Sequence, residues 1–453
     1  MQPLPKEFEE QMKRLLGEAG FFAYLDALNQ PYTRALRVNL LLRPDGTPSC
    51  PIEGLGAPVP WAKGAYFVEG DARPGLSPLH EGGLFYMQEP SALTAVTALD
   101  PQPGERVLDL CAAPGGKSTQ IAALMAGRGL LCCNEPIPNR AQILSRNIER
   151  MGVRNAVVLS AMPDALAPRF PAFFDRILVD APCSGEGMFR RQPEARDEWD
   201  ADAPRRCADR QMEILAQAAK MLRPGGTMVY STCTFNDTEN EGVLKRFLAL
   251  HPEFSLVPFA LPGLPEAKDG YLHLYPHEMR GEGHFVSRLK KADGADEADA
   301  PVQAAPQRKA PARAAAKGKA PASIALPDVF SDAFAPERLY TVGDALWMLP
   351  EGISIERLSG LRVLRTGLLL AHAEGKRSEP DHALAMALRP EEAARTASLT
   401  QTQALAYQAG ETLSLGDLPG GYTLLCCEGV SLGWGKQAGG LMKNHYPKGL
   451  RRR

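Results

Sequence analysis

The strongest constraint on the fold is a regular alternation of strand-like and helix-like segments between residues 103 and 290. Strands are expected at residues 105–110, 129–135, 155–160, 174–180 and 227–232, and helices at residues 118–127, 137–152 and 205–222. This alternation predicts a mostly parallel, doubly wound sheet with helices on both faces. The sequence Arg-Pro-Gly-Gly at 223–226 is expected to end the last helix and open the next strand. Two late segments, 270–276 and 283–290, alternate like a hairpin and predict an antiparallel edge.

The rest of the chain divides around this sheet region, which is assigned to residues 99–291. Residues 1–98 combine short helical and strand-like pieces with many proline and glycine breaks, and predict a small α+β domain. Residues 292–323 are rich in alanine and proline and nearly free of large apolar side chains, so they predict a flexible linker. Short strand patterns return over residues 324–453 and predict a β-rich region of one or two lobes.

The composition excludes several classes of protein. The chain has 453 residues, a formal net charge of −2 at pH 7 and no apolar run of 18 residues, so no membrane span is expected. Its polar N-terminus lacks the apolar middle of a signal peptide, and a cytoplasmic protein is expected. The nine cysteines are an odd number without a Cys-x-x-Cys pair, which argues against a disulfide framework and against a metal site. A functional cysteine should therefore act as a free thiol.

The loop after the first strand, RVLDLCAAPGGKST at 106–119, has two interpretations. Its final Gly-Lys-Ser matches a phosphate-binding loop, but Cys111 occupies the place of that motif's first glycine. Alternatively, the backbone of Gly115 and Gly116 approaches a nucleoside cofactor at the start of the next helix. Such a cofactor needs an acid near the end of the second strand, and Glu135 has that spacing, although it could simply cap the following helix.

Two cysteines, Cys183 and Cys233, follow directly after the fourth and fifth expected strands. A free cysteine is more often a small buried apolar residue, and this interpretation is assigned to Cys132, Cys133, Cys426 and Cys427. Cys183 lies between proline and Ser-Gly, and Cys233 lies between two threonines, so neither belongs to an apolar strand. Both thiols should face the crevice at the carboxyl ends of the strands, where a phosphate-loop enzyme would have no use for them.

Two thiols, a carboxylate and an adenosine cofactor fit the methylation of a pyrimidine at C5. A thiolate that adds to C6 makes C5 nucleophilic toward the methyl group of S-adenosyl-L-methionine, and the target base must leave its stack. Asp180, at the end of the fourth strand, is placed to stabilise the adduct near N3 by hydrogen bonding or proton donation. Lys117 could lower the pKa of a neighbouring thiol. Spacing alone leaves open which thiol attacks.

Three segments carry a family resemblance. In chain order they are LDLCAAPGGKSTQIA (108–122), DAPCSGEGMFR (180–190) and STCTF (231–235), and they closely resemble the Nop/Sun family of RNA cytosine-C5 methyltransferases. The resemblance extends to YTRALRVNLLL (32–42), GLFYMQEPSAL (83–93) and GEGHFVSRLKK (281–291). The linker and GWGKQAGGLMKNHYP (433–447) resemble the bacterial RsmF type, which methylates small-subunit ribosomal RNA and carries a C-terminal PUA-like module. The resemblance implies a Rossmann-like class I methyltransferase sheet with an antiparallel edge hairpin, between an RNA-contacting N-terminal domain and a PUA-like C-terminal domain.

The resemblance also implies roles for individual residues. Cys233 would be the nucleophile and Cys183 the cysteine that assists release. The cofactor would be held by Cys111, Ala112, Ala113, Pro114, Gly115, Gly116, Lys117, Glu135 and Asp180. The chain departs from the family at the end of the third strand, where an acid often contacts the adenine: Met162 stands near that position, and Asp164 is not taken as a substitute.

The RNA contacts are less constrained by the sequence. Arg34 and Arg37 are the candidate phosphate contacts, whereas the basic tail at 451–453 is equally well a solvated surface. The aromatic residues Tyr32, Phe85, Tyr86 and Trp434 could stack on bases, but aromatic side chains more often pack in a core. The expected partner is ribosomal RNA or the small ribosomal subunit, bound by a monomer. Transfer RNA, or a role in ribosome assembly without turnover, is the alternative, and the latter would need neither thiol.

Overall fold

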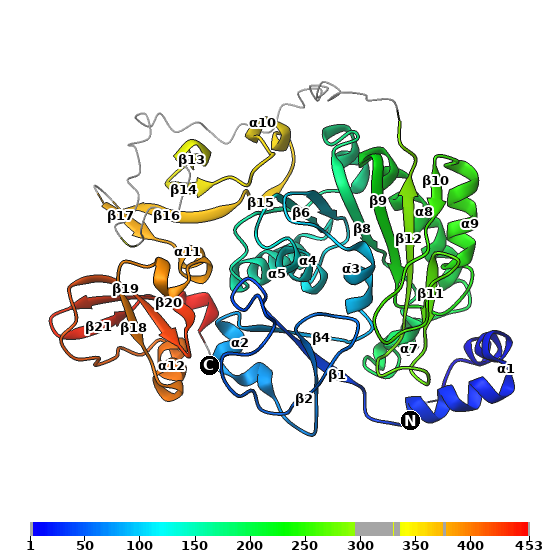
Figure 1. Cartoon of the computed structure of the whole chain (residues 1–453), viewed down its shortest axis with the longest axis horizontal. Helices are drawn as coiled ribbons and strands as arrows, with labels where there is room; N and C mark the ends of the chain where they lie inside the picture. The colour runs from blue at the N-terminus through cyan, green and yellow to red at the C-terminus, as the bar shows by residue number, and fades with distance from the viewer. Residues whose placement is uncertain (1–2, 295–328, 330–335, 375–376, 452–453) are drawn as a thin grey trace.

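The computed structural model describes residues 3–294, 329, 336–374 and 377–451. The expected linker at 292–323 lies outside these residues except for its first three positions. At the centre is a nine-stranded sheet with the order β10-β12-β9-β8-β5-β6-β7-β15, in which β11 pairs with β12 (Figure 1). The parallel strands are β5 (Arg106–Asp109), β6 (Leu130–Asn134), β7 (Ala156–Leu159), β8 (Phe174–Asp180) and β9 (Leu222–Thr232). The predicted doubly wound sheet is confirmed.

One edge of this sheet is antiparallel, as the alternation predicted. It contains β10 (Phe254–Leu256), β11 (Tyr271–Leu274) and β12 (His284–Lys291). Residues 223–226 were expected to separate the helix from the next strand, but they lie inside β9, which begins at Leu222. The pairing of β9 with β8 shifts register across this segment, where Gly225 has a φ of 68° that glycine adopts without a steric penalty.

Helices cover both faces of the central sheet. One face carries α3 (Leu93–Leu99), α4 (Gly116–Leu124) and α5 (Pro138–Arg150), and the other carries α6 (Pro163–Leu166), α8 (Ala203–Met221) and α9 (Glu241–Leu250). Neighbouring residues of a strand point to opposite faces, so Cys132 and Cys133 belong to the two different cores, and both are fully buried. These two cysteines, with Cys426 and Cys427, are buried as the sequence predicted.

The N-terminal domain begins with α1 (Lys6–Leu28), a long helix with a kink at Gly17. A four-stranded antiparallel sheet follows, formed by β1 (Arg34–Val38), β2 (Leu55–Pro58), β3 (Ala65–Val68) and β4 (Phe85–Gln88), with α2 (Pro78–Glu81) beside it. The apolar side of α1 packs against Phe189 and Phe235, which belong to the two cysteine-bearing segments. The N-terminal helix therefore supports the region where the site is expected.

The C-terminal region contains two further four-stranded sheets. The first comprises β13 (Leu339–Val342), β14 (Ala345–Met348), β16 (Leu368–Glu374) and β17 (Arg377–Pro380), and the second comprises β18 (Thr396–Ser398), β19 (Gly421–Cys427), β20 (Val430–Ala438) and β21 (Leu441–Asn444). Helices α11 (His382–Ala387) and α12 (Gln401–Ala409) pack between and beside them (Figure 1). The second sheet shares a buried apolar cluster with the N-terminal domain. Among the described residues, no helix is long and apolar enough to cross a membrane.

Nothing in the sequence pattern indicates the ninth strand of the central sheet. This strand, β15 (Val363–Arg365), comes from the C-terminal region and pairs antiparallel with β7. The N–H of Ser160, just after β7, donates to the Arg362 carbonyl at 2.9 Å, and the Arg365 guanidinium forms an ion pair with Glu149 of α5. The C-terminal region thus completes the sheet on which the site is built.

Candidate active site

The loop from Cys111 to Lys117 joins β5 to α4 and is fixed by α5. The Asn147 side chain donates to the Pro114 carbonyl at 2.9 Å, and the Ala113–Pro114 peptide bond is cis. Gly115 has a φ of 114°, and a Cβ there would lie 3.2 Å from a Leu144 methyl group. Both its conformation and its close packing therefore require glycine at this position.

A cleft of about 640 Å³ opens at the carboxyl ends of the parallel strands. The predicted site residues that line it are Cys111, Ala113, Glu135, Asp180, Cys183 and Cys233, together with Met162 and Asp164. Ala112, Pro114, Gly115, Gly116 and Lys117 belong to the same loop without lining the cleft. The structure also brings Arg210, Glu213 and Gln217 of α8 to this cleft, and no sequence signal marks them, because they lie on the polar side of an ordinary amphipathic helix.

Glu135 lines the cleft and also bonds to the residue just before α5. Its side chain is only 3% exposed, one carboxylate oxygen accepts the Ile137 N–H at 3.0 Å, and the other lies 3.5 Å from an Arg140 nitrogen. The carboxylate therefore caps the start of α5 and at the same time lines the cleft. Its function as a ribose contact stays a prediction.

The cleft has the chemistry that an adenosine cofactor needs. Ile137 and Met162 line it with exposed apolar side chains, 51% and 61% accessible, which suit the flat faces of an adenine. The N-terminus of α4 and the backbone of Gly115 lie beside the loop and favour polar or anionic groups. The residues present thus fit S-adenosylmethionine, with an apolar side chain at Met162 in place of the family's acid.

The two predicted thiols lie side by side. The sulfur atoms of Cys183 and Cys233 are 3.3 Å apart, and both cysteines are free and partly exposed. The two segments are tied together by the Gly187 N–H, which donates to the Cys233 carbonyl at 2.8 Å, and by a 2.7 Å hydrogen bond between Ser184 and Thr234. The hydrogen bond with Cys233, followed by burial, raises the pKa of the Cys183 thiol well above its usual value.

A buried carboxylate that was not predicted holds these segments in place. Glu239 is fully buried and accepts hydrogen bonds from the Ser184 N–H at 3.0 Å and from the side chains of Gln211 and Asn236, each at 2.8 Å. Burial raises its pKa despite these three donors. The only sequence signal is the polar run NDTEN after the STCTF segment, which is equally typical of a surface loop.

Asp180 lines the same cleft as the thiols and has three partners. One carboxylate oxygen is 2.8 Å from Lys117 Nζ. The other accepts from Ser231 Oγ at 2.8 Å and lies 3.5 Å from His284 Nε2. Burial alone would raise the pKa of Asp180, but the Lys117 ammonium and His284 outweigh it and hold this pKa well below its usual range. Asp180 is therefore ionised in the free protein.

Asp109, at the end of β5, is a second acid near the loop from Cys111 to Lys117. It is fully buried and accepts from Ser118 Oγ at 2.7 Å, while its other oxygen has no hydrogen-bond partner among the residues that the structure describes. Burial raises the pKa of Asp109 to about 7, against the lowering effect of the Ser118 hydrogen bond.

The expected RNA contact at Arg37 needs correction. Its side chain is 1% exposed, and its guanidinium donates to the Thr119 hydroxyl at 2.8 Å and to the Gly116 carbonyl at 3.2 Å. Arg37 therefore holds the start of α4 rather than facing solvent. Arg34 is partly exposed and donates to the carbonyls of Gly70 and Ala72, so its role toward RNA stays a prediction.

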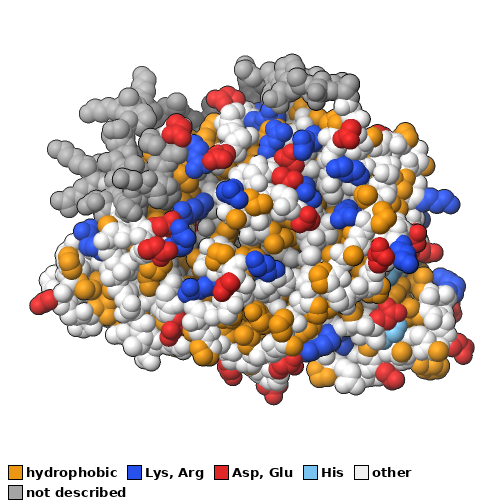
Figure 2. Space-filling view, viewed as in Figure 1, with side chains coloured by type: hydrophobic (Ala, Val, Ile, Leu, Met, Phe, Trp, Pro, Cys, Tyr) orange, Lys and Arg blue, Asp and Glu red, His pale blue; other side chains and the backbone are white. Residues whose placement is uncertain are grey.

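The aromatic candidates divide in the same way. Phe85, Tyr86 and Trp434 are buried at 0%, 9% and 2% exposure and pack in cores, whereas Tyr32 is 47% exposed. Basic and acidic side chains are interspersed on the face shown in Figure 2.

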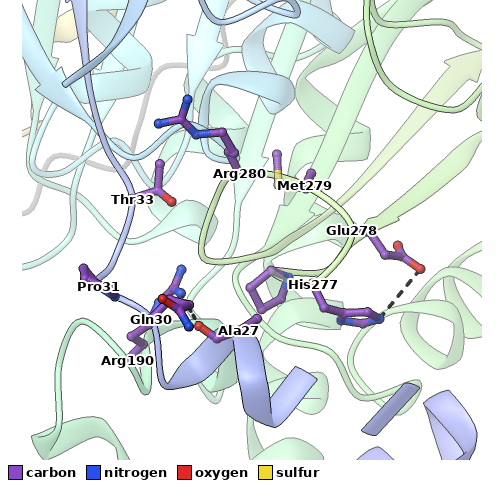
Figure 3. Close-up of a pocket in the computed structure, with 10 residues that line it drawn as sticks. Ala27, Gln30, Pro31, Thr33, Arg190, His277, Glu278, Met279 and Arg280 are labelled. Atoms are coloured by element: carbon purple, nitrogen blue, oxygen red, sulfur yellow. Dashed lines mark hydrogen bonds and ion pairs between the residues drawn. The ribbon is translucent and has the colours of Figure 1, made fainter. Parts of the chain in front are cut away.

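A second open pocket, of about 390 Å³, lies between the end of α1 and the 276–280 loop (Figure 3). Arg190, from the DAPCSGEGMFR segment, lines this pocket and donates to the Ala27 carbonyl at 2.6 Å.

A doubly wound sheet with an antiparallel edge and a cleft at its first loop is the architecture of class I S-adenosylmethionine-dependent methyltransferases, and a pair of free thiols in that cleft is what methylation of a pyrimidine carbon would use. Matches to family models agree with this class. They are 16S rRNA methyltransferase RsmB/F over residues 96–290, the N-terminal domain of 16S rRNA methyltransferase RsmF over 4–90, its first C-terminal domain over 327–388 and its PUA domain over 394–452. The chain belongs to this family of RsmF-type 16S rRNA methyltransferases.

Individual relatives extend over nearly the whole chain. Ribosomal RNA small subunit methyltransferase F of Erwinia tasmaniensis is 33% identical and is matched over 98% of this chain and 96% of its own length. The protein of that name from Enterobacter sp. is 34% identical, over 98% and 95%. A solved methyltransferase homolog from Pyrococcus horikoshii is 31% identical, with a TM-score of 0.53 over 63% of this chain and 95% of that one. NSun6 from the same organism, solved with the S-adenosylmethionine analogue SFG, shares the fold at 23% identity, with a TM-score of 0.55 over 64% and 99%.

Proposed function

We propose that the protein is an S-adenosylmethionine-dependent RNA cytosine-C5 methyltransferase that acts on small-subunit ribosomal RNA through a covalent cysteine adduct. The observation that carries the proposal is the pair of free thiols 3.3 Å apart in a cleft that an ionised carboxylate, Asp180, also lines. A protein that only binds RNA would need neither thiol. The names of the relatives, which specify small-subunit ribosomal RNA, support the choice of substrate over transfer RNA.

The chain's own residues account for the steps at the base. The Cys233 thiolate attacks C6 of a cytosine that has left its stack, while Asp180, which lines the cleft and is paired with Lys117, would hold the polar edge of the base. The bound S-adenosylmethionine supplies an electrophilic methyl group. Once C5 carries the methyl group, the C5 proton leaves to solvent and the bond between C6 and the Cys233 sulfur breaks, which returns the thiolate. The raised pKa of Cys183 supports Cys233 as the attacking residue, because a thiol that stays protonated is a poor nucleophile.

Two cysteine variants test this mechanism. Cys233→Ala should abolish methyl transfer from radiolabelled S-adenosylmethionine to small-subunit ribosomal RNA while it preserves cofactor binding in a thermal-shift assay. Cys183→Ala should instead accumulate a covalent protein–RNA adduct on denaturing gels. Cys207→Ala is the matched control, because Cys207 lies on α8 and does not line the cleft. Unchanged methylation in both of the first two variants would show that the adduct mechanism is wrong.

The RNA substrate, the oligomeric state and the cellular location are tested separately. Bisulfite sequencing of ribosomal and transfer RNA from cells that lack the protein should reveal an unmethylated cytosine in small-subunit ribosomal RNA. A loss confined to transfer RNA would reassign the substrate. We also propose that the protein acts as a monomer in the cytoplasm, and light scattering on the purified chain, together with cell fractionation, tests both assignments.

A further inference from the structure

Three neighbouring strands, β8, β9 and β12, bring polar side chains together at the edge of the sheet that also carries the thiols. Asp180 ends β8, and its register partner Ser231 lies near the end of β9. Because β12 runs antiparallel to β9, its first residue, His284, lies at the same edge of the sheet as these strand ends. His284 faces the same side of the sheet as Asp180 and Ser231, as strand alternation requires.

The His284 imidazole is positioned toward a single acceptor. Its side chain is 3% exposed, and Nε2 lies 3.5 Å from the Asp180 carboxylate without a hydrogen-bond partner of its own in the described part of the chain. A buried polar atom without a partner is costly, so such an arrangement calls for a functional reason. A functional reason would be that the 3.5 Å separation between His284 Nε2 and the Asp180 carboxylate shortens to a hydrogen bond when the substrate binds.

The proposed addition of the Cys233 thiolate to the base requires a proton donor near Asp180. When the Cys233 sulfur bonds to C6, the C5–C6 electron pair moves between C4 and C5, and the electron pair of the C4–N3 double bond moves onto N3. N3 then needs a proton, but Asp180 is ionised in the free protein and has none to give. The Asp180 carboxylate raises the pKa of Lys117 despite burial, which makes that ammonium a reluctant donor. Imidazole is the side chain that gives and takes protons most readily near neutral pH.

We propose that His284 is a positioning residue that supplies the Asp180 carboxylate with the proton needed at N3 during thiol addition, an inference that rests on the proposed cytosine methylation. The imidazolium Nε2–H passes its proton to Asp180, and Asp180 passes a proton to N3 as the bond between sulfur and C6 forms. On release, the proton returns from N3 through Asp180 to His284. The C5 proton leaves separately to solvent, so the sequence balances.

Few other titratable groups face this relay. Around Asp180 the structure places Lys117 from α4, His284 from β12, Asp109 from β5 and the thiols Cys183 and Cys233, which line the same cleft. On β11, Leu274 is the register partner of His284. The titratable residues of that strand, Tyr271 and His273, face the opposite side of the sheet, where His273 bonds to Glu241 at 2.6 Å.

The test is a pH profile of single-turnover methylation, with the full-length protein, saturating S-adenosylmethionine and a small-subunit ribosomal RNA fragment. For the wild type, the rate constant should fall as the pH rises from 5.5 to 8, because the relay needs a donor that still holds its proton. His284→Gln should lower the rate constant at pH 6.5 by about 100-fold, the usual size of a lost proton-transfer step, and remove this fall. The cofactor KM should stay unchanged. His273→Gln, on the opposite side of the sheet, is the control and should behave like the wild type.

A second readout isolates the addition step. In the Cys183→Ala background, His284→Gln should slow the appearance of the covalent RNA adduct by the same factor. A wild-type profile that is flat from pH 5.5 to 8, or a His284→Gln variant with the wild-type rate and profile, would overturn the inference even where methylation itself is observed. If the wild type methylates no cytosine in any RNA, it is the proposed function that fails. If the His284→Gln variant does not fold, the pH profile of the wild type alone tests the inference.

Discussion

The Lys117–Asp180 ion pair offers a quantitative test of how the site is held together. At an effective dielectric constant of about 20, two unit charges 2.8 Å apart attract by about 6 kcal/mol. Removing both charges from water offsets part of this attraction, and breaking a buried pair from one side typically costs about 3–5 kcal/mol. Lys117→Met should therefore lower the free energy of unfolding by about 3 kcal/mol at pH 7, because it leaves the Asp180 charge with only Ser231 and His284 as partners.

A double-mutant cycle measures the pair itself. Urea unfolding of the wild type, Lys117→Met, Asp180→Asn and the double variant, without cofactor, gives the coupling free energy. The folded-state pKa of Asp180 is depressed, so the pair's contribution is fully present above the carboxyl's usual pKa of about 4 and declines as the pH falls toward the folded-state pKa. The coupling should thus be constant from pH 6 to pH 8.

An exposed pair of similar geometry provides the control. Arg246 and Asp209 lie 3.0 Å apart with about half of each side chain exposed, and solvent screening should leave them with only a small coupling. The reasoning is refuted if the Lys117–Asp180 coupling is below about 1 kcal/mol at pH 7, or if it grows as the pH is lowered.

Two further predictions concern buried charges near the loop. Because burial raises the folded-state pKa of Asp109 to about 7, ionisation of this carboxyl opposes folding, and wild-type stability should fall relative to Asp109→Asn as the pH rises from 4 to 7. The difference should reach a few kcal/mol in urea unfolding, and a pH-independent difference would contradict the assignment. Arg37→Gln should lower the melting temperature, because its guanidinium holds Gly116 and Thr119, but it should leave the salt dependence of RNA binding unchanged. A smaller salt slope in filter binding would restore Arg37 as a phosphate contact.

Most of the central sheet could be predicted from the sequence, because short apolar runs mark the parallel strands and the helices at 137–152 and 205–222 have clear periodicity. The closeness of Cys183 and Cys233 also followed, since parallel neighbouring strands end at the same edge of a sheet. His284 could not be placed, because its position depends on the antiparallel direction of β12 and on which side of that strand faces Asp180. These are properties of pairing between segments far apart in the chain.

Arg37 and β15 show two other limits of sequence patterns. An arginine in a short strand with no acidic neighbour normally indicates a surface, and nothing local reveals that α4 covers this one. The three residues of β15 are too few for any periodicity, and their partner strand, β7, lies about 200 residues earlier in the chain. Packing against a distant element decided both outcomes.

The position of β15 has a consequence for how the protein is made. The strand that lies against β7 is residues 363–365 of 453, so on a ribosome the catalytic sheet stays one strand short until more than three quarters of the chain has been synthesised. Until then, β7 presents an unpaired edge, the kind of surface on which nascent chains aggregate. A gene truncated just after the methyltransferase region would keep every residue proposed for chemistry and still encode an unfinished sheet. Selection for a foldable enzyme therefore acts on the C-terminal region independently of any RNA that this region binds.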